Sequence, residues 1–236
     1  MPKTKHMLVL AHSIKHWPGV CVAGREIRSG ESQYTIGPWI RPVSSHGEGE
    51  LSPSECQLSN GRQPRVMDFV EISLANRSND PLQPENWLIE TATQWRPVNG
   101  QYQKPSLDLL IDEPPNLWLQ RKERTDRVSS DHLRRSPPDQ SLYLVRVQNL
   151  RARFEWKEWD GRYKQHRRAL FLYNGIEYEF NITDPQFSEK HRSRFPAKRQ
   201  PSNTFSVTSA TGCHLCVSLA PEFNRYHYKV VATMFD

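Results

Sequence analysis

The residues best suited to chemistry lie between positions 151 and 180, where basic and aromatic side chains alternate closely. Lysine and arginine neutralise phosphates, and aromatic rings stack on nucleobases, each stacked base contributing about 1–3 kcal/mol. This mixture predicts a nucleic-acid-binding surface. The residues expected to form it are Arg151, Arg153, Lys157, Arg162, Lys164, Arg167 and Arg168, together with Trp156, Trp159 and Tyr163.

The spacing of these residues predicts a strand with two different faces. Successive side chains of a strand point to opposite sides, so the cations at 151, 153 and 157 fall opposite Phe154 and Trp156. We expect the rings inside and the cations outside, with Trp159 exposed for stacking beside a turn at Asp160-Gly161. The alternative is an ordinary solvated charged face over a packed aromatic core.

A second candidate phosphate site combines Lys15 and His16 with Arg41, which lies at the end of a predicted strand. The planar guanidinium of arginine can grip a phosphate or a carboxylate with two hydrogen bonds. The alternative is that Arg41 pairs with an acid of the protein, such as Glu26 or Asp68.

A nuclease-like string is also present, with Asp139 followed by Glu155 and Lys157. An aspartate and an acid-x-lysine pair can hold Mg²⁺ and orient a water for attack on a phosphodiester. Short strings of this kind arise often by chance, and the helix-flanked mixed sheet that normally supports such a site is not predicted here.

Other catalytic and metal-binding motifs give weaker signals. Cys213 and Cys216 have the C-x-x-C spacing of a redox or half-zinc site, but a structural zinc needs a second ligand pair, and Cys21 and Cys56 lie far apart. We expect reduced thiols, no metal and no cofactor. The sequence contains no GxxxxGK[ST], HExxH or GxSxG motif, which disfavours a nucleotide hydrolase or a serine hydrolase.

The elements that must position these residues read mainly as strands. Short apolar runs are separated by Gly, Pro, Asn and Ser, and 18 prolines are hard to reconcile with long helices. Turns at Asp160-Gly161 and Asn174-Gly175 are typical of β-hairpins. The strands that we expect cover residues 7–12, 20–27, 34–43, 68–75, 87–93, 142–154, 154–159, 163–173, 176–182, 213–219 and 227–235.

Residues 104–140 have a different pattern, typical of a basic, partly helical and partly mobile connector. Leucines at helical spacing predict a short helix near 107–111, and residues 116–124 predict another. Ser129 and Ser130 are suitable N-caps for a third helix that Pro137 ends. A single helical turn is expected at 52–58.

The number of strands favours two small barrels. About five strands precede the connector and five or six follow it, as required for two five-stranded OB-like barrels in tandem. We therefore predict an all-β fold with a few short helices, in which residues 1–103 form the first barrel, 104–140 the connector and 141–236 the second barrel. The alternative is a single β-sandwich with insertions.

The charge of +6 is uneven along the chain. Residues 1–140 carry 17 basic and 17 acidic side chains, whereas residues 141–236 carry 15 and 9, so a polyanion would be attracted to the C-terminal half. No apolar segment is long enough to span a bilayer, and the apolar run at 7–11 is too short for a signal peptide. We expect a cytoplasmic protein without a membrane partner.

Several short motifs occur in an order that resembles a known family. The motifs are carried by Ser13, Lys15, Gly19, Cys21, Ala23 and Gly24, by residues 39–44 (WIRPVS), by Asn174, Gly175, Tyr178, Thr183, Asp184 and Pro185, and by residues 216–219 (CVSL) and 228–232 (YKVVA). The chain resembles the prokaryotic dual OB-fold domain-containing proteins over nearly its whole length, except at 45–65 and 104–140. The resemblance implies two OB-like barrels and a nucleic-acid role, often in antiviral defence or nucleic-acid modification, and it supplies no catalytic residue.

Three functional hypotheses follow. The first is a module that binds single-stranded DNA or structured RNA as an accessory component of such a system, and this is the hypothesis that we favour over an enzyme. The second is a metal-dependent nuclease using Asp139, Glu155 and Lys157. The third is an adaptor that docks an effector or helicase protein, in which case the basic face serves only solubility.

Overall fold

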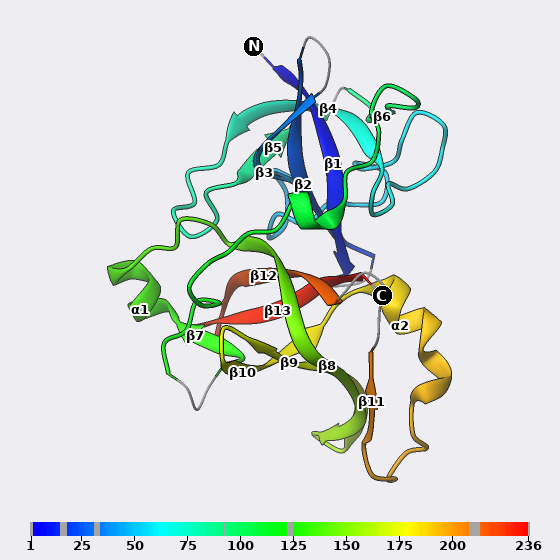
Figure 1. Ribbon diagram of the computed structural model, residues 1–236, viewed down its shortest axis with the longest axis vertical. Helices are drawn as coiled ribbons and strands as arrows, with labels where there is room; N and C mark the ends of the chain where they lie inside the picture. The colour runs from blue at the N-terminus through cyan, green and yellow to red at the C-terminus, as the bar shows by residue number, and fades with distance from the viewer. Residues whose placement is uncertain are drawn as a thin grey trace. The chain divides into compact units, whose positions relative to one another are not determined.

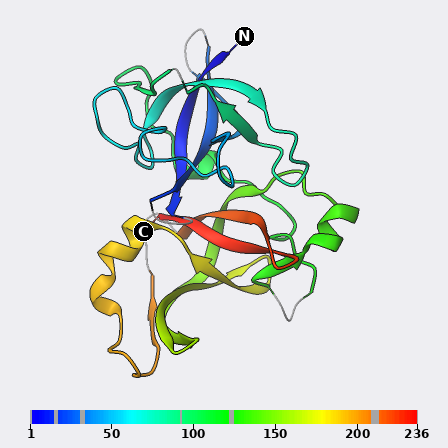
Figure 2. The same ribbon diagram turned by 180° about the vertical axis from the view of Figure 1, so that it is seen from behind.

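Strands dominate the chain in a computed structural model, which describes residues 2–14, 18–30, 34–91, 93–121, 125–207 and 213–235, except for the side chains of Ser29 and Trp159 (Figures 1 and 2). The contacts divide it into two compact units. The first comprises Met1–Leu110 and Asp139–Ser141, and the second comprises Ile111–Pro138 and Leu142–Asp236. Within the described ranges, no helix is both long and apolar enough to cross a membrane.

The first unit is a closed five-stranded barrel with the circular order β1–β2–β3–β5–β4. Strand β1 pairs with both β2 and β4, which closes the barrel, and β3 and β5 run parallel, while its other neighbouring strands are antiparallel. The strands are β1 (Lys3–Ile14), β2 (Val20–Ser29), β3 (Tyr34–Val43), β4 (Phe69–Arg77) and β5 (Asn86–Ile89), with β6 (Arg96–Pro97) paired to β4 and the 3₁₀ helix η1 (Leu107–Leu109) after it.

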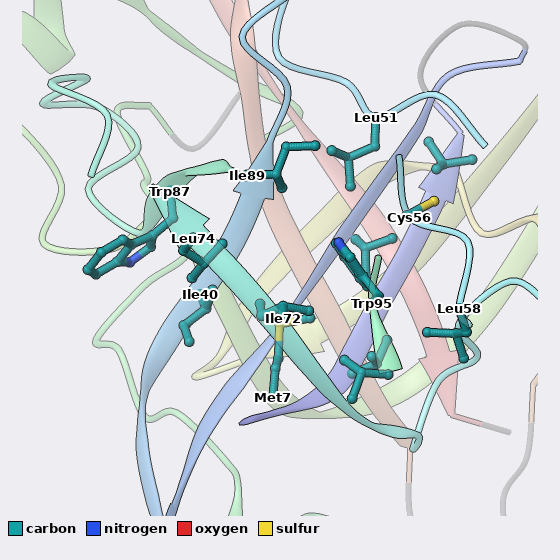
Figure 3. Packing of buried hydrophobic residues seen from close by; sticks show 14 residues of the cluster. Met7, Ile40, Leu51, Cys56, Leu58, Ile72, Leu74, Trp87, Ile89 and Trp95 are labelled. Atoms are coloured by element: carbon teal, nitrogen blue, oxygen red, sulfur yellow. The ribbon is translucent and has the colours of Figure 1, made fainter. Parts of the chain in front are cut away.

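Apolar side chains from every barrel strand and from the loops meet inside this barrel (Figure 3). Met7, Ile72 and Trp95 are at most 1 % exposed. Gly24 of β2 lies so close to β1 that a Cβ at this position would be 2.0 Å from the carbonyl oxygen of Leu8. This close approach explains why glycine stands there in one of the motifs singled out above.

The second unit repeats the same plan. Its circular order is β8–β9–β10–β13–β12, and the third and fifth barrel strands, β10 and β13, again run parallel. The strands are β8 (Leu142–Trp159), β9 (Arg162–Tyr173), β10 (Ile176–Ile182), β12 (Cys213–Phe223) and β13 (Tyr226–Phe235), with β7 (Arg127–Ser129) paired to β13. The expected all-β class and the pair of five-stranded OB-like barrels are therefore confirmed, and the β-sandwich alternative is excluded.

Strand β8 is long because it serves two pairings in succession. Its first part pairs with β12, and its register with β9 shifts between Gln148 and Arg151, where Asn149 adopts a positive φ of 53°. Beyond this bulge β8 pairs with β9 as far as Trp159 and Arg162, while β10 pairs with β9 only over residues 168–173. The hairpin therefore extends beyond the barrel, and β11 (Asn203–Ser206) lies along part of its β8 edge (Figure 1).

The segment between β10 and β12 contains α2 (Pro185–Lys190) and the 3₁₀ helix η2 (Arg192–Arg194). Asp184 is 4 % exposed and caps α2, since its Oδ1 accepts hydrogen bonds from the backbone N–H groups of Gln186 and Phe187 at 2.8 and 3.0 Å. Its Oδ2 accepts a third from the N–H of Met234 at 2.9 Å. The Thr-Asp-Pro motif thus fixes α2 to the last strand of the barrel.

Residues 104–140, expected as a connector, are divided between the units, with 104–110 in the first, 111–138 in the second and 139–140 in the first again. Helix α1 (Ser130–Arg135) begins where expected, with the Ser129 Oγ accepting from the His132 N–H. The helix expected from residue 116 is wrong within 116–121, because Asn116 accepts from the Leu119 N–H in a turn and Trp118 has a positive φ.

In the first unit, the single helical turn expected at 52–58 is not formed as a helix. Residues 52–58 form turns there.

Candidate nucleic-acid interface

Two of the predicted phosphate-binding cations are engaged within the protein. Arg168 Nε donates to Glu179 Oε1 at 2.8 Å, and Arg153 donates to the same oxygen. Arg168 also donates to Asn181 Oδ1 at 2.6 Å and lies 3.7 Å from Asp126. Alternation along β8 gave its two faces correctly. The pairing of β10 with β9, however, places Glu179 opposite Leu170 and next to these arginines, so they are less available to a ligand than expected.

The remaining cations of this face differ in how exposed they are and in whether an acid lies beside them. Lys157 Nζ lies 3.1 Å from Glu155 Oε1, and its side chain is half exposed. Arg151, Arg162 and Lys164 are exposed. The available positive charge on this face therefore lies at its two ends, at Arg151 beside the bulge and at 162–164 next to the hairpin turn.

A groove of about 840 Å³ lies on the second barrel over β8, β9 and β10. Half-buried Leu170 pairs across the sheet with Arg151 on one side and Glu179 on the other, and Leu172 pairs with Gln148 and Glu177. We call this the β8–β10 groove. Its lining comprises Thr125, Asn149, Leu150, Arg151, Leu170, Phe171, Leu172, Glu177, Tyr178, Glu179, Ser206, Val207 and Cys213.

The opposite face of the hairpin carries the rings, as expected. Phe154 is fully buried and stacks on Phe195 with centroids 4.7 Å apart. Trp156 is half-buried, and its Nε1 donates to the carbonyl of Pro196 at 2.9 Å. Arg167 lies on this face, with its guanidinium 4.7 Å from the Phe195 centroid, and burial lowers its pKa.

Of the other predicted binding residues, some lie outside the described part of the chain and one is buried within the first unit. Lys15 and His16 lie outside the described residues, as does the side chain of Trp159. Arg41 is 7 % exposed, 3.2 Å from Glu85, and its Nη2 donates to Ser141 Oγ at 3.1 Å. Engagement with Glu85 and Ser141 disfavours a phosphate grip by Arg41, and Glu85 is an acidic partner that the sequence did not suggest.

The three residues of the nuclease hypothesis do not belong to one compact unit. Asp139 is exposed in the first unit, whereas Glu155 and Lys157 are paired with each other on β8 of the second. Across the described ranges, no group of three His, Cys, Asp or Glu side chains could hold a metal ion.

Cys213 and Cys216 both lie on β12, three residues apart. Cys213 is half-buried at the groove, and Cys216 is fully buried. The redox or zinc interpretation of their spacing gains no support from this placement.

Sequence reasoning missed the groove itself, because a hollow depends on which side chains meet across three strands. It also gave little weight to the loop after η2, where Lys198 and Arg199 are exposed. A usable signal existed, since the sequence has no acidic residue from Lys190 to Pro221.

Comparison with known proteins agrees with this architecture. The model of a family described as dual OB-containing domain matches residues 5–234. No curated protein matches the chain. A solved structure of a murine DNA-binding protein bound to double-stranded DNA aligns with 100 % of this chain and 96 % of that chain, at 6 % identity and a TM-score of 0.31, a likeness too slight to argue from.

Proposed function

We propose that this chain, which belongs to the dual OB-containing domain family, binds nucleic acid through its second barrel. OB barrels bind oligonucleotides on the face of their second and third strands and on the loops at its edges. In the second barrel those strands are β9 and β10, and the β8–β10 groove lies over them. The position of this groove is the observation that carries the proposal.

The chemistry of the groove suits unpaired nucleotides. Leu170 and Leu172 offer half-buried apolar surface on which the flat faces of bases or sugars can pack. Arg151 is exposed beside them and can neutralise a phosphate. Because a base must leave its pair to reach the leucines, we propose single-stranded DNA or the single-stranded parts of structured RNA as ligand.

The basic tip of the hairpin extends the same surface. The Asp160-Gly161 turn joins the first two barrel strands, and exposed Arg162 and Lys164 follow it directly. A strand lying in the groove can therefore meet further cations where β8 and β9 project beyond the barrel.

Polarisation of labelled single-stranded oligonucleotides at 50 and 200 mM salt tests this proposal. Arg151→Ala should weaken binding and reduce the salt slope by about 0.7, as expected for one lost phosphate contact to a single strand. Leu170→Ala should weaken binding with little change of slope. The control is Arg65→Ala, which removes an exposed cation of the first barrel. If neither Arg151→Ala nor Leu170→Ala changes the affinity, the groove is not the binding site.

The cellular setting is a separate proposal. A role as an accessory component of prokaryotic defence or nucleic-acid modification, in the cytoplasm and beside an effector or helicase, rests on family resemblance. Co-purification of the full chain with such a partner from its native host would support it.

A further inference from the structure

The face of the β8–β9 hairpin opposite the groove carries a series of cations placed on aromatic rings. Its rings come from the hairpin, Trp156 and Tyr163, and from the loop after η2, Phe195. Its cations come mostly from the same loop. We call the set Trp156, Tyr163, Phe195, Arg167, Lys198 and Arg199 the cation–aromatic ladder.

The members of the ladder lie in contact one after another. Lys198 Nζ is 5.4 Å from the Trp156 centroid, and Trp156 meets the edge of Phe195 with centroids 5.9 Å apart. Arg167 lies over Phe195 at 4.7 Å. Farther along, Arg199 is 5.9 Å from the Tyr163 centroid and its Nε donates to the Tyr163 hydroxyl at 3.3 Å.

This arrangement leaves little ring surface for nucleobases. A cation over a ring is stabilised by about 0.5–1 kcal/mol at an exposed site, and a base could stack only by displacing it. Meanwhile Lys198 and Arg199 are exposed, and the rings restrict the motion of their long side chains. The ladder therefore presents ordered positive charge rather than stacking platforms.

Few acids oppose this charge. In the part of the chain that the structure describes, Lys198 and Arg199 have no carboxylate partner, and the loop belongs to a run without acids from Lys190 to Pro221. On the hairpin, Glu158 pairs across the strands with Tyr163 and adds one negative charge to this face. The groove face, in contrast, contains Glu155, Glu177 and Glu179.

We propose that the ladder is a second nucleic-acid contact, which binds the phosphate backbone without regard to the bases. This inference rests on the proposed function and extends it. The groove would bind unpaired nucleotides, whereas the ladder would bind the sugar–phosphate backbone of single or double strands. The two contacts lie on opposite faces of one hairpin, so they engage different stretches of a polynucleotide.

The test compares two double variants of the full chain, Lys198→Ala/Arg199→Ala and the control Arg65→Ala/Lys104→Ala. Both remove two exposed cations, the second pair from the first barrel. With duplex DNA, each phosphate contact adds about 0.9 to the salt slope. We expect the salt slope of the ladder variant to be smaller by about 1.8. Raising the salt from 50 to 200 mM should therefore reduce the affinity of the unaltered protein by about tenfold more than that of the variant.

A strand with its bases removed separates the two contacts. The ladder variant should lose the same factor of affinity on abasic and on normal single strands, whereas the loss caused by Leu170→Ala should shrink on the abasic strand. If the ladder variant matches the control on every ligand, the ladder is refuted and the groove stands. If the ladder variant loses affinity on normal strands but not on abasic strands, the ladder stacks on bases and the inference is also refuted. If the unaltered protein binds no nucleic acid, both proposals are overturned.

Discussion

The guanidinium of Arg168 holds the carboxylate of Glu179, with Nε 2.8 Å from Oε1. Burial alone would raise the pKa of Glu179, but the hydrogen bond from Arg168 and the charges of Arg168 and Arg153 lower it below its usual range. The carboxylate is therefore ionised at neutral pH and cancels positive charge at the edge of the groove. This pairing limits how strongly the groove face attracts phosphates.

Replacing Glu179 with Gln should tighten nucleic-acid binding. The change removes the carboxylate charge that Arg153 and Arg168 share, although Arg168 keeps its contacts with Asn181 and Asp126. Each phosphate newly contacted by a single strand should then steepen the salt slope by about 0.7. Polarisation titrations at several salt concentrations measure this slope. Glu177→Gln removes a negative charge from the same strand without freeing an arginine, and an equal gain in both variants would contradict the role of the pairing.

Lys229 should make stability depend on pH. It is fully buried, its Nζ has no hydrogen-bond partner within the described residues, and burial lowers its pKa to about 7 despite the opposing charge of Asp126. The unfolded chain binds this proton up to a pH near 10.5, so between pH 7 and 10.5 it holds more protons than the folded chain. The free energy of unfolding should therefore rise with pH in that window, by at most about 1.4 kcal/mol per pH unit.

Urea unfolding between pH 6 and 9 tests this dependence. Lys229→Met should remove the rise and stabilise the protein most at the low-pH end, where the buried lysine must be charged in both states. Lys164→Met, at an exposed position, should leave the pH profile unchanged. A profile that is the same in all three proteins would mean that Lys229 is not buried as described.

Gly24→Ala should destabilise the first barrel strongly. The added Cβ would overlap the Leu8 carbonyl oxygen and the Met7 side chain, and overpacking of this kind costs about 1–3 kcal/mol or more. Gly100→Ala is the comparison, since Gly100 has a positive φ but open space around it, and should cost about 1 kcal/mol. Thermal unfolding of the two variants should rank them in this order.

Asp184→Ala should cost more stability than removal of an ordinary helix cap. It leaves three backbone donors, at Gln186, Phe187 and Met234, without their acceptor. Loss of an N-cap costs about 1 kcal/mol, and a buried donor left unpaired adds about 1–3 kcal/mol. In urea unfolding, Ser129→Ala at the cap of α1 should show only the first cost, and similar losses in both variants would argue against the tie to Met234.

Local signals in the sequence predicted much of the fold. The Asp160-Gly161 and Asn174-Gly175 turns lie where expected, because a two-residue hairpin needs little beyond its own residues. Alternation along β8 correctly placed Phe154 inside. The short strands β6, β7 and β11 escaped prediction, because each is held by pairing to a partner distant in sequence.

The site was harder to predict, because its properties depend on register and on loops. The register set by the Asp160-Gly161 turn places Arg153 opposite Arg168, but only the pairing of β9 with β10 brings Glu179 to them. Likewise, nothing near Arg41 in the sequence identifies Glu85 and Ser141 as its partners. Composition therefore predicted a charged surface correctly but overstated how many of its charges are free.

The placement of Ser141 has a consequence for how this architecture can be inherited. The chain passes from the first unit to the second after Leu110, returns to the first at Asp139 and leaves it again after Ser141. Within the first unit, Ser141 contacts Arg41 and Glu85. A single recombination point between the barrels would therefore separate one of them from a piece that it packs with. We therefore expect exchange between relatives to preserve the two barrels as a pair.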